Sequence, residues 1–241
     1  MKLDILIIAA HPDDAELSMG GTIAMLTSKG YKVGIIDLTQ GELGTRGNKF
    51  TRKKESEEAS EILKVTVREN LKLKDGSIYD NDTNRKLLVE KIRKHKPSLL
   101  FAPYFNDRHP DHISASRLAK SAMFFSGVTK IKTSADKENQ SVFRPLKLFY
   151  YMQAYPFEPT FIVDISEYFE LKMRSVFAYK TQFYDPNSKE PKTFISDPKF
   201  TKYLEARARF YGFQIGKEYG EAFYCEELIE YDFINLLGGK K

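Results

Sequence analysis

The sequence predicts an α/β fold: a mostly parallel sheet with helices on both faces. Short apolar runs alternate along the chain with stretches of helical spacing, an order typical of parallel strands joined by helices. The first apolar run, residues 3–10, lacks the alternation of a half-exposed strand and should be covered on both faces. Two histidine-containing loops, 11–16 and 106–112, directly follow predicted strands. Ligands in such sheets bind beyond the carboxyl ends of the strands, so the two loops should meet there.

The individual elements are predicted from apolar runs, helical spacing and turn residues. A helix-like stretch runs from Thr22 to Ser28 and ends before Gly30, because glycine tolerates the left-handed conformation that follows a last helical turn. Thr51 is expected to cap a helix, and Pro110 suits a first helical turn because its missing N–H would lack an intrahelical partner. Further strands are expected at 33–38, around 71–73, at 98–103, 146–153 and 161–164, and further helices at 51–63, 84–95, 110–125, 165–179 and 198–213.

One stretch gives no clear prediction of secondary structure. Residues 128–145 are charged and lack a periodic signal, so we expect a mobile loop there. No internal repeat, low-complexity tract or linker interrupts the chain, and residues 1–241 are expected to form a single domain.

Composition excludes several classes of partner. The 241 residues include 38 Lys and Arg against 33 Asp and Glu, and glutamates stand within the densest basic run, residues 53–58, so no nucleic-acid partner is expected. Cys225 is the only cysteine, which rules out an internal disulfide and fits a reducing compartment. No apolar stretch reaches the roughly 18 residues that a membrane span needs. The first ten residues contain Asp4 and run into the first loop without a signal cleavage site. We therefore expect a soluble, cytoplasmic protein with no membrane partner.

Histidine is rare in this chain, and three of its four copies lie in the two loops. His11 and Asp14 are three residues apart, close enough to bind one ion from a turn, and His112 would complete the set from the second loop. Two histidines and a carboxylate make a catalytic Zn²⁺ set with an open position for water, and Fe²⁺ suits the same donors. A lone histidine after a strand is usually structural, but two His-Pro-Asp segments indicate a shared metal site. The fourth histidine, His95, ends a Lys-rich helix and is given no role.

Residues beside these ligands are candidates for catalysis. Bound zinc lowers the pKa of its water to about 7, and Asp13 could take the proton as that water attacks a carbonyl carbon. The alternative is that Asp13 caps the following helix. His109, three residues before His112, could as an imidazolium stabilise the oxyanion and protonate the leaving amine. Asp111 could orient a histidine ring or act only as a first-turn acid, and Glu16 is expected to secure the loop.

Longer motifs extend beyond these residues. They are AHPDDAE at 10–16, MGGT at 19–22, GELGTRG at 41–47, RHPDH at 108–112, YKTQF at 179–183 and YGEAF at 219–223. With them the chain closely resembles the PIG-L-like (LmbE-like) zinc deacetylases over nearly its whole length. The resemblance implies a Rossmann-like fold, removal of an acetyl group from an N-acetylated sugar and, as in several bacterial members, a homo-hexamer. It assigns zinc ligands His11, Asp14 and His112, general base Asp13, and His109 for the oxyanion and leaving group.

Two arginines extend the resemblance to the substrate. GELGTRG and YGEAF together are most similar to the bacillithiol-pathway deacetylases that act on N-acetylglucosaminyl malate. Arg46 lies in the first of these motifs, and Arg52 stands where family members place a substrate-contacting arginine. Arginines present a planar donor fork that matches carboxylates such as those of malate. The alternative for Arg52 is a solvated charge at a helix start.

Other functions stay open at this point. They are a general N-acetylsugar or chitooligosaccharide deacetylase, a mycothiol-type thiol-conjugate amidase that cleaves a larger amide, and a non-catalytic sugar- or metal-binding protein on the same fold. The presence of Asp13 and His109 argues against the last, since binding alone needs neither. A nucleotide-binding function is disfavoured because no GxGxxG follows the first strand.

Overall fold

A seven-stranded sheet forms the centre of the protein, in a computed structural model that describes residues 1–135, 138–183, 186 and 188–230. The strands are β1 (Ile5–Ala9), β2 (Val33–Thr39), β3 (Val67–Leu73), β4 (Leu99–Pro103), β7 (Lys147–Tyr151), β8 (Phe161–Asp164) and β9 (Gly220–Tyr224). Their order across the sheet is β3-β2-β1-β4-β7-β9-β8. The first five strands in this order are parallel to one another, and β9 is antiparallel to both β7 and β8. The predicted, mostly parallel sheet is confirmed.

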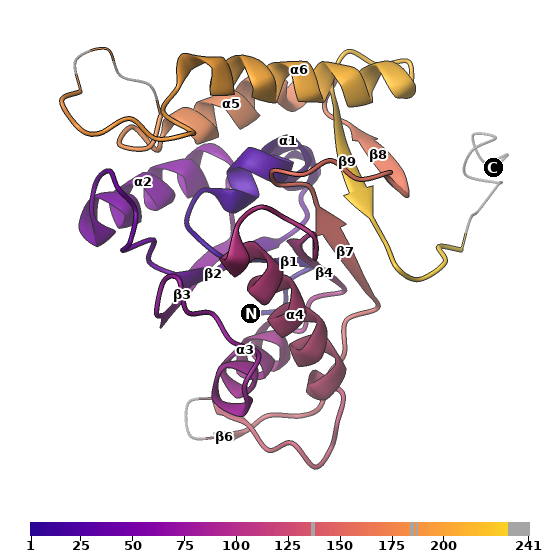
Figure 1. The fold of residues 1–241 in the computed structure, drawn as a ribbon. Helices are drawn as coiled ribbons and strands as arrows, with labels where there is room; N and C mark the ends of the chain where they lie inside the picture. Colours follow the sequence, from indigo (N-terminus) through magenta and orange to yellow (C-terminus); the bar gives the residue numbers. More distant parts are fainter. Residues whose placement is uncertain (136–137, 184–185, 187, 231–241) are drawn as a thin grey trace, which may run out of the picture.

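Helices cover both faces of this sheet (Figure 1). They are α1 (Asp14–Ser28), α2 (Lys49–Ile62), α3 (Asp82–His95), α4 (Pro110–Ser126), the 3-10 turn η1 (Ser166–Tyr168), α5 (Phe169–Phe177) and α6 (Pro198–Gln214). Helices α3 and α4 pack together on one face, while α1, α2 and α5 cover the other. Helix α6 packs against β9 and, through Leu204, against the group formed by α1, α2 and α5.

The continuous apolar run at the start of the chain is explained by this two-sided covering. Leu6 and Ile8 of β1 point into the core beneath α3 and α4, whereas Ile5 and Ile7 point into the core beneath α1. Successive side chains of a strand point to opposite faces, so a strand between two helical layers needs apolar residues at every position.

The strand order reverses between β1 and β4, and this reversal positions the site. From β1 the chain continues through α1 to β2 on one side, and from β4 it continues through α4 to β7 on the other. The loops that leave β1 and β4 therefore diverge to opposite faces of the sheet, and ligands in such sheets bind between the starting points of the two loops. The two predicted histidine loops are those two loops.

The helix after β1 differs from the prediction. It begins at Asp14 and not at Thr22, and it is broken at Met19, where the backbone leaves helical geometry. The carboxylate of Glu221 from β9 accepts hydrogen bonds from the backbone N–H groups of Gly21 (3.0 Å) and Thr22 (2.7 Å). It thereby caps the second half of α1, which is the half that the sequence predicted. In the first half, Ala15 and Met19 pack into the core beneath α1 and Leu17 packs into the cluster shared with α2 and α5. These tertiary contacts are not revealed by the sequence of a segment this short.

Three smaller predictions also need correction. The N-cap of α2 is Asn48, and Thr51 forms the other half of a reciprocal capping box with it. The predicted helix 165–179 begins with the 3-10 turn η1 before α5. Strand β9 was not predicted, because it is short and is recognised as a strand only by its pairing with β7 and β8.

The segment 128–145 is only partly irregular. It contains a short antiparallel pair, β5 (Ser134–Ala135) and β6 (Glu138–Asn139), with 136–137 outside the described residues. The guanidinium of Arg93 on α3 donates to the carbonyl groups of Val128 and Ile131 and to the hydroxyl of Thr133. The start of this segment is therefore attached to α3, and the prediction of a simple mobile loop was wrong for that part.

Two further expectations concern the extent of the domain and the absence of a membrane span. The predicted domain of residues 1–241 includes 231–241, which lie outside the described residues. Among the helices that the structure does describe, none is both long enough and apolar enough to cross a bilayer.

Candidate metal centre and active site

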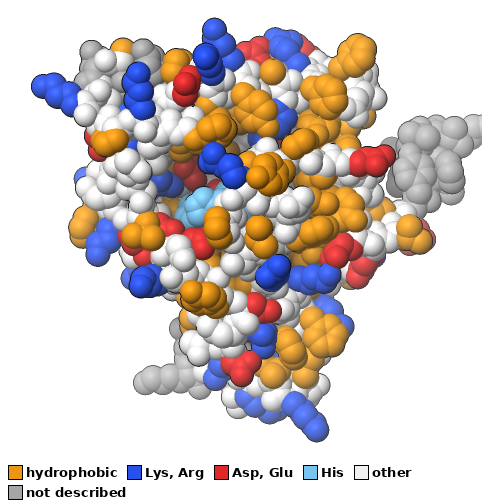
Figure 2. Space-filling view, in the orientation of Figure 1, with side chains coloured by type: hydrophobic (Ala, Val, Ile, Leu, Met, Phe, Trp, Pro, Cys, Tyr) orange, Lys and Arg blue, Asp and Glu red, His pale blue; other side chains and the backbone are white. Residues whose placement is uncertain are grey.

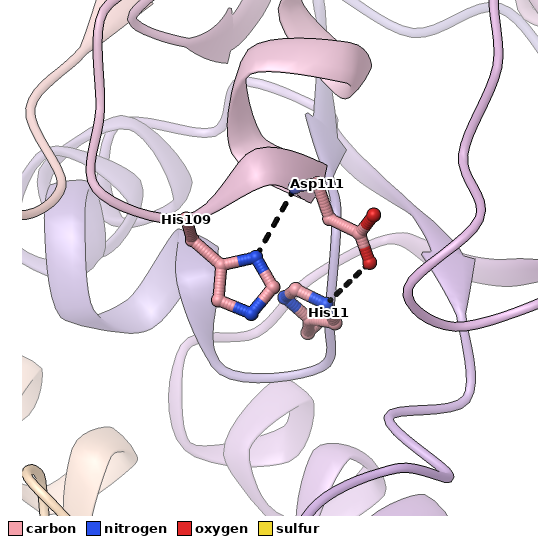
Figure 3. A group of neighbouring side chains, drawn as sticks. All are labelled: His11, His109 and Asp111. Carbon is pink, nitrogen blue, oxygen red and sulfur yellow. Dashed lines mark hydrogen bonds and ion pairs between the residues drawn. The ribbon is translucent and has the colours of Figure 1, made fainter.

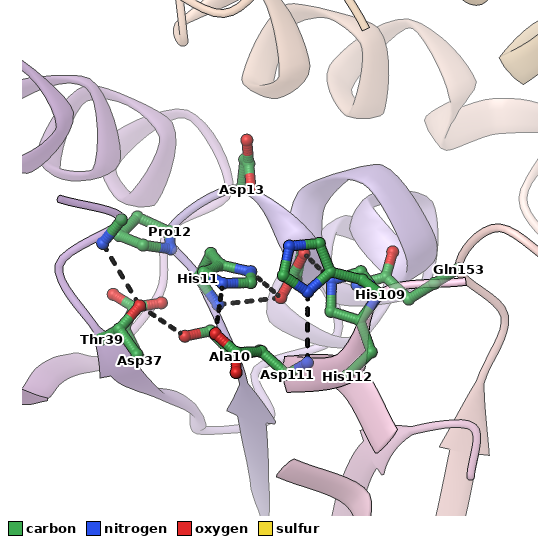
Figure 4. A network of polar contacts seen from close by, with 12 residues as sticks. Ala10, His11, Pro12, Asp13, Asp37, Thr39, His109, Asp111, His112 and Gln153 are labelled. Carbon is green, nitrogen blue, oxygen red and sulfur yellow. Dashed lines mark hydrogen bonds and ion pairs between the residues drawn. The ribbon is translucent and has the colours of Figure 1, made fainter. Parts of the chain in front are cut away.

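The two histidine loops meet at the carboxyl ends of β1 and β4, as predicted (Figure 4). They line one cavity of about 1130 Å³, to which His11, Asp13, Asp14, His109 and His112 all contribute. In the space-filling view a histidine side chain is visible inside a hollow below α6 (Figure 2). The site is therefore open to a ligand from the surface.

His11, Asp14 and His112 form a three-donor set around one point. Their ligand atoms all lie within 4.8 Å of one another. The Asp14 carboxylate lies between the rings, with Oδ2 3.6 Å from His11 Nδ1 and Oδ1 3.3 Å from His112 Nε2. Two imidazole nitrogens and one carboxylate oxygen on a single point are a donor set for zinc or ferrous iron with open positions. The structure thus brings together the three predicted ligands.

Carboxylates behind the set fix which nitrogen of each ring faces it. His112 Nδ1 lies 2.8 Å from Asp107 Oδ1, and His11 Nε2 lies 3.1 Å from Asp75 Oδ1 and 3.3 Å from Asp111 Oδ2. Ionised carboxylates only accept hydrogen bonds, so those ring nitrogens carry the protons. His11 Nδ1 and His112 Nε2 are then the nitrogens that face Asp14 and would bind a metal, an orientation that second carboxylates give to metal-binding histidines.

The electrostatics of the set favour a cation. Burial alone would lower the pKa of His112, but Asp14 and Asp107 outweigh it and raise that pKa to about 9. Burial alone would raise the pKa of Asp14, but His112 and His11 outweigh it and hold that pKa well below its usual range. Four carboxylates surround two imidazoles, and a divalent ion would balance the excess of negative charge. The residues present therefore fit a bound metal.

A second group, His11, His109 and Asp111, fits a metal less well (Figure 3). Its members already bond to one another, since Asp111 Oδ2 contacts His11 Nε2 and the Asp111 backbone N–H donates to His109 Nδ1 at 3.2 Å. Asp111 also accepts from the backbone N–H of Gly76 (2.8 Å). Asp111 thus lies in the first turn of α4 and also orients the His11 ring, which makes it a positioning residue.

Asp13 has the geometry of a reactive carboxylate and not of a helix cap. It occupies the N-cap position of α1, but its side chain makes no capping hydrogen bond. Its φ of 118° lies in a region that non-glycine residues rarely adopt, and such strain is concentrated at functional sites. Burial raises the pKa of Asp13 to about 7, although the neighbouring Arg52 opposes this shift. A carboxylate with this pKa can both accept and return a proton near neutral pH.

The structure changes the expected charge of His109. Burial and the nearby His11 and His112 rings lower the pKa of His109. Its Nδ1 accepts the backbone N–H of Asp111, so a neutral ring carries its proton on Nε2. The expected imidazolium is therefore disfavoured in the free protein. His109 remains able to donate a hydrogen bond from Nε2 into the cavity that it lines.

The two arginines that were predicted to contact substrate instead bond to other groups of the protein. Arg52 is buried, its Nη2 lies 3.1 Å from Asp13 Oδ2, and it donates to the carbonyl of Pro12. It lines the cavity but faces Asp13 rather than presenting a free fork, and it is not the solvated charge of the alternative. Arg46 donates to the Phe183 carbonyl (3.0 Å) and to Ser188 Oγ (2.7 Å), and among the described residues it does not line the cavity.

Sequence reasoning missed Asp75, Asp107 and Gln153. Asp75 lies two residues after the end of β3, and Asp107 lies in the second histidine loop, so position near a strand end could have indicated both. Gln153 follows β7 and lines the cavity. Its Oε1 accepts from Ser18 Oγ at 2.7 Å, while its buried Nε2 has no partner among the described residues.

Two other predictions concern support around the site. Glu16 is fully buried, and its Oε1 bonds to Arg68 Nη1 (2.5 Å) and to the Tyr179 hydroxyl (3.1 Å). It thus secures α1 to β3 and to the loop after α5. His95 ends α3 as predicted, but it is buried, with Nε2 2.8 Å from Glu69 Oε1.

Known proteins are similar to this chain in both sequence and fold. Residues 6–123 match the family described as PIG-L, GlcNAc-PI de-N-acetylase. The diacetylchitobiose deacetylase of Thermococcus kodakarensis is 31% identical over 232 residues, which cover 90% of this chain and 80% of that protein. The chain belongs to the PIG-L family. The crystal structure of a conserved protein from Thermus thermophilus is 37% identical and superposes with a TM-score of 0.86, covering 95% of this chain and 97% of that one.

Membership in the PIG-L family confirms the resemblance and the coarse function: this is a protein of the N-acetylated-sugar deacetylases. The finer subgroup is not established by similarity. A probable N-acetyl-α-D-glucosaminyl L-malate deacetylase 2 of Bacillus cereus is 26% identical over 197 residues, covering 76% of this chain and 84% of that protein. That is a lower identity over a shorter stretch than the chitobiose enzyme shows.

Proposed function

We propose that this PIG-L protein uses a bound divalent metal, with zinc as first choice, to hydrolyse the acetamide of an N-acetylglucosamine-containing substrate. One observation carries the proposal. His11, Asp14 and His112 converge on one point with oriented ring nitrogens, and the strained, buried Asp13 lies beside them. A metal site that only binds a ligand has no need for a neighbouring carboxylate whose pKa is raised to about 7.

The residues divide the chemistry between them. A bound divalent ion would polarise the acetamide carbonyl and make a water more acidic. Asp13 takes a proton from the attacking water while oxygen bonds to the carbonyl carbon. His109 donates a hydrogen bond from Nε2 to the carbonyl oxygen as negative charge develops there. When the carbon–nitrogen bond breaks, the proton held by Asp13 passes to the leaving nitrogen, which gives acetate and a free amine.

Two groups are candidates for the part of the substrate beyond the reacting sugar. A malate aglycone was expected to bind Arg46 and Arg52, but Arg46 bonds to Phe183 and Ser188, and Arg52 bonds to Asp13. We therefore propose a neutral N-acetylglucosamine disaccharide as first candidate, in keeping with the similarity to a diacetylchitobiose deacetylase. N-Acetylglucosaminyl malate is the second candidate. It is favoured by Arg108, an exposed cavity residue without a hydrogen bond or ion pair to any described residue.

Acetate release tests the proposal directly. Purified, zinc-loaded protein is incubated with N,N′-diacetylchitobiose, N-acetylglucosamine and N-acetylglucosaminyl malate, and acetate and free amine are quantified. We expect equal amounts of both products from at least one substrate. Asp13→Asn should retain its metal and lose about 10²–10⁴ in rate. A wild-type protein that binds metal and these sugars but releases no acetate would be a binding protein, and near-normal turnover by Asp13→Asn would mean that another group takes the proton.

A further inference from the structure

The metal centre forms only part of the cavity lining. The cavity has a volume of about 1130 Å³, above the roughly 300–1,000 Å³ of pockets that enclose drug-sized ligands. Much of the remaining lining comes from α6 and from Phe194 in the segment before it. A substrate that fills the cavity therefore contacts residues more than 80 positions away from the second histidine loop.

One face of α6 presents a row of aromatic rings to this cavity. The row on the helix consists of Phe200, Tyr203 and Phe210, with Arg207 between the last two. The spacing of three, four and three residues places all four side chains on one side of the helix, and all four line the cavity. Phe194 extends the row, since its ring centroid lies 5.5 Å from that of Phe200, which in turn lies 6.1 Å from that of Tyr203. Hydrophobic side chains gather over α6 beside the hollow that contains the histidine (Figure 2).

Phe200 packs against the core cluster of α1, α2 and α5, but the other rings of the row are not used to build the core. Phe194 is 57% exposed, Tyr203 40% and Phe210 60%. Contiguous exposed apolar side chains inside a cavity are typical of a ligand-binding surface. Phe213 provides a contrast on the same helix, since it is 84% exposed but does not line the cavity.

The charges beside the row indicate what it would bind. Arg108 lies over the Phe194 ring at 4.3 Å and Arg207 over the Tyr203 ring at 5.5 Å. Both donor nitrogens of the Arg207 fork are bound to backbone carbonyls, those of Gln153 (2.6 Å) and Leu17 (2.9 Å). A dicarboxylate would need several hydrogen-bond donors that are not already bound to the protein, and the aromatic row offers few of them. A pyranose ring suits it better, because its C–H face packs on an aromatic ring while its hydroxyls reach the polar groups at the edge.

We infer that the exposed rings of the aromatic row, those of Phe194, Tyr203 and Phe210, form a subsite for the second sugar ring of the substrate. This second ring is the one that keeps its acetyl group during the reaction. The inference rests on the proposed function, because the first ring must lie at the metal centre. It assigns disaccharide specificity to residues that the metal-binding motifs do not contain. The row then selects substrate length and does not take part in the chemistry.

The test compares substrates of different length in matched variants. Zinc-loaded wild type, Phe194→Ala and Tyr203→Ala are assayed on N,N′-diacetylchitobiose and on N-acetylglucosamine. The ratio of the two kcat/KM values should favour the disaccharide in the wild type and fall about tenfold in each variant, mainly through KM, as expected for lost uniform binding. Phe213→Ala is the control on the same helix and should leave the ratio and both activities unchanged. Light scattering during size-exclusion chromatography gives the oligomeric state of each protein.

The outcomes separate the subsite from the proposed function. Acetate release from neither sugar by the wild type would overturn the proposed function and the subsite with it. Acetate release with the same ratio in wild type and both variants would overturn the subsite alone. A changed oligomeric state with equal losses on both sugars would also overturn it, because the row would then be a contact between copies of the chain. A ratio that falls in the two row variants and not in Phe213→Ala supports the subsite.

Discussion

Arg52 Nη2 lies 3.1 Å from Asp13 Oδ2, and both side chains are buried. This ion pair joins the start of α2 to the loop after β1, and it places a permanent positive charge beside the proposed general base. Burial raises the pKa of Asp13 to about 7, and Arg52 is the largest influence in the opposite direction. The arginine therefore keeps part of the Asp13 population ionised near neutral pH, a role different from the substrate contact that sequence comparison suggested.

Removing this charge should move the acidic limb of the pH–rate profile. In Arg52→Ala the pKa of Asp13 rises, so the ionised base forms only at higher pH and the acidic limb of kcat/KM shifts upward. The shift should be at least about one pH unit, since an opposite charge within about 4–6 Å lowers the pKa of an Asp by about 1–3. Arg52→Lys keeps a charge and should shift the limb less. An acidic limb that stays in place in Arg52→Ala would mean that Arg52 does not act through Asp13.

The metal-ligand assignment predicts different outcomes for two histidines of one loop. His112→Ala removes a ligand, and the purified protein should lose most of its bound metal while its circular dichroism spectrum stays unchanged. His109→Ala is the matched control, because His109 stacks on His112 at 4.9 Å between ring centroids but is not placed among the ligands. It should retain metal and lose turnover. Metal content is measured by elemental analysis, and equal metal loss in both variants would contradict the assignment.

Strand ends made the metal site predictable from the sequence. The residues that follow β1 and β4 are close in space because parallel strands have their carboxyl ends at one edge of the sheet. His11 and His112 could therefore be paired although about a hundred residues separate them. The same rule would have found Asp75 after β3, which holds the His11 ring.

The orientation of the long side chains could not be predicted in this way. Arg46 and Arg52 appear in the sequence as free cations near a glycine-rich loop. Their partners, the Phe183 carbonyl and Asp13, are far from them along the chain and are reached only after the loop has folded. Similarly, the helical spacing in 198–213 predicted α6 but could not show that Tyr203 and Phe210 line a cavity instead of entering the core.

A cluster remote from the site predicts how stability depends on pH. Burial alone would raise the pKa of Glu69, but hydrogen bonds from Lys91, Lys94 and His95 outweigh it and lower that pKa to about 2 from an ordinary 4.5. The ionised carboxylate is favoured in the folded state, so it stabilises the fold above pH 4.5, and this contribution is lost as the pH falls from 4.5 towards 2. Glu69→Gln should thus lower Tm most at neutral pH, and its difference from wild type should shrink below pH 4.5.

The control for this measurement is Glu61→Gln, at an exposed position of α2 that has no ion pair with a described residue. Its Tm should follow that of the wild type at every pH. A Tm difference for Glu69→Gln that stays constant between pH 7 and pH 3 would show that the charge of Glu69 is not responsible.

The last prediction concerns the aglycone and distinguishes the two candidate substrates by charge. Arg108 lines the cavity beside Phe194, and its guanidinium has no ion pair or hydrogen bond within the described chain. It is therefore the arginine best able to contact a malate carboxylate, in place of Arg46 and Arg52. If the wild type accepts N-acetylglucosaminyl malate, Arg108→Ala should lower kcat/KM for that substrate about tenfold or more relative to N,N′-diacetylchitobiose, since one charge-assisted contact contributes about 1.5–3 kcal/mol. Arg117→Ala, at an exposed position of α4 outside the cavity lining, is the matched control and should leave the ratio unchanged. Because the aromatic row favours a sugar ring, we also expect the wild type to prefer the disaccharide. A strong preference for the malate conjugate that Arg108→Ala does not reduce would contradict both the neutral-substrate proposal and the role given to Arg108.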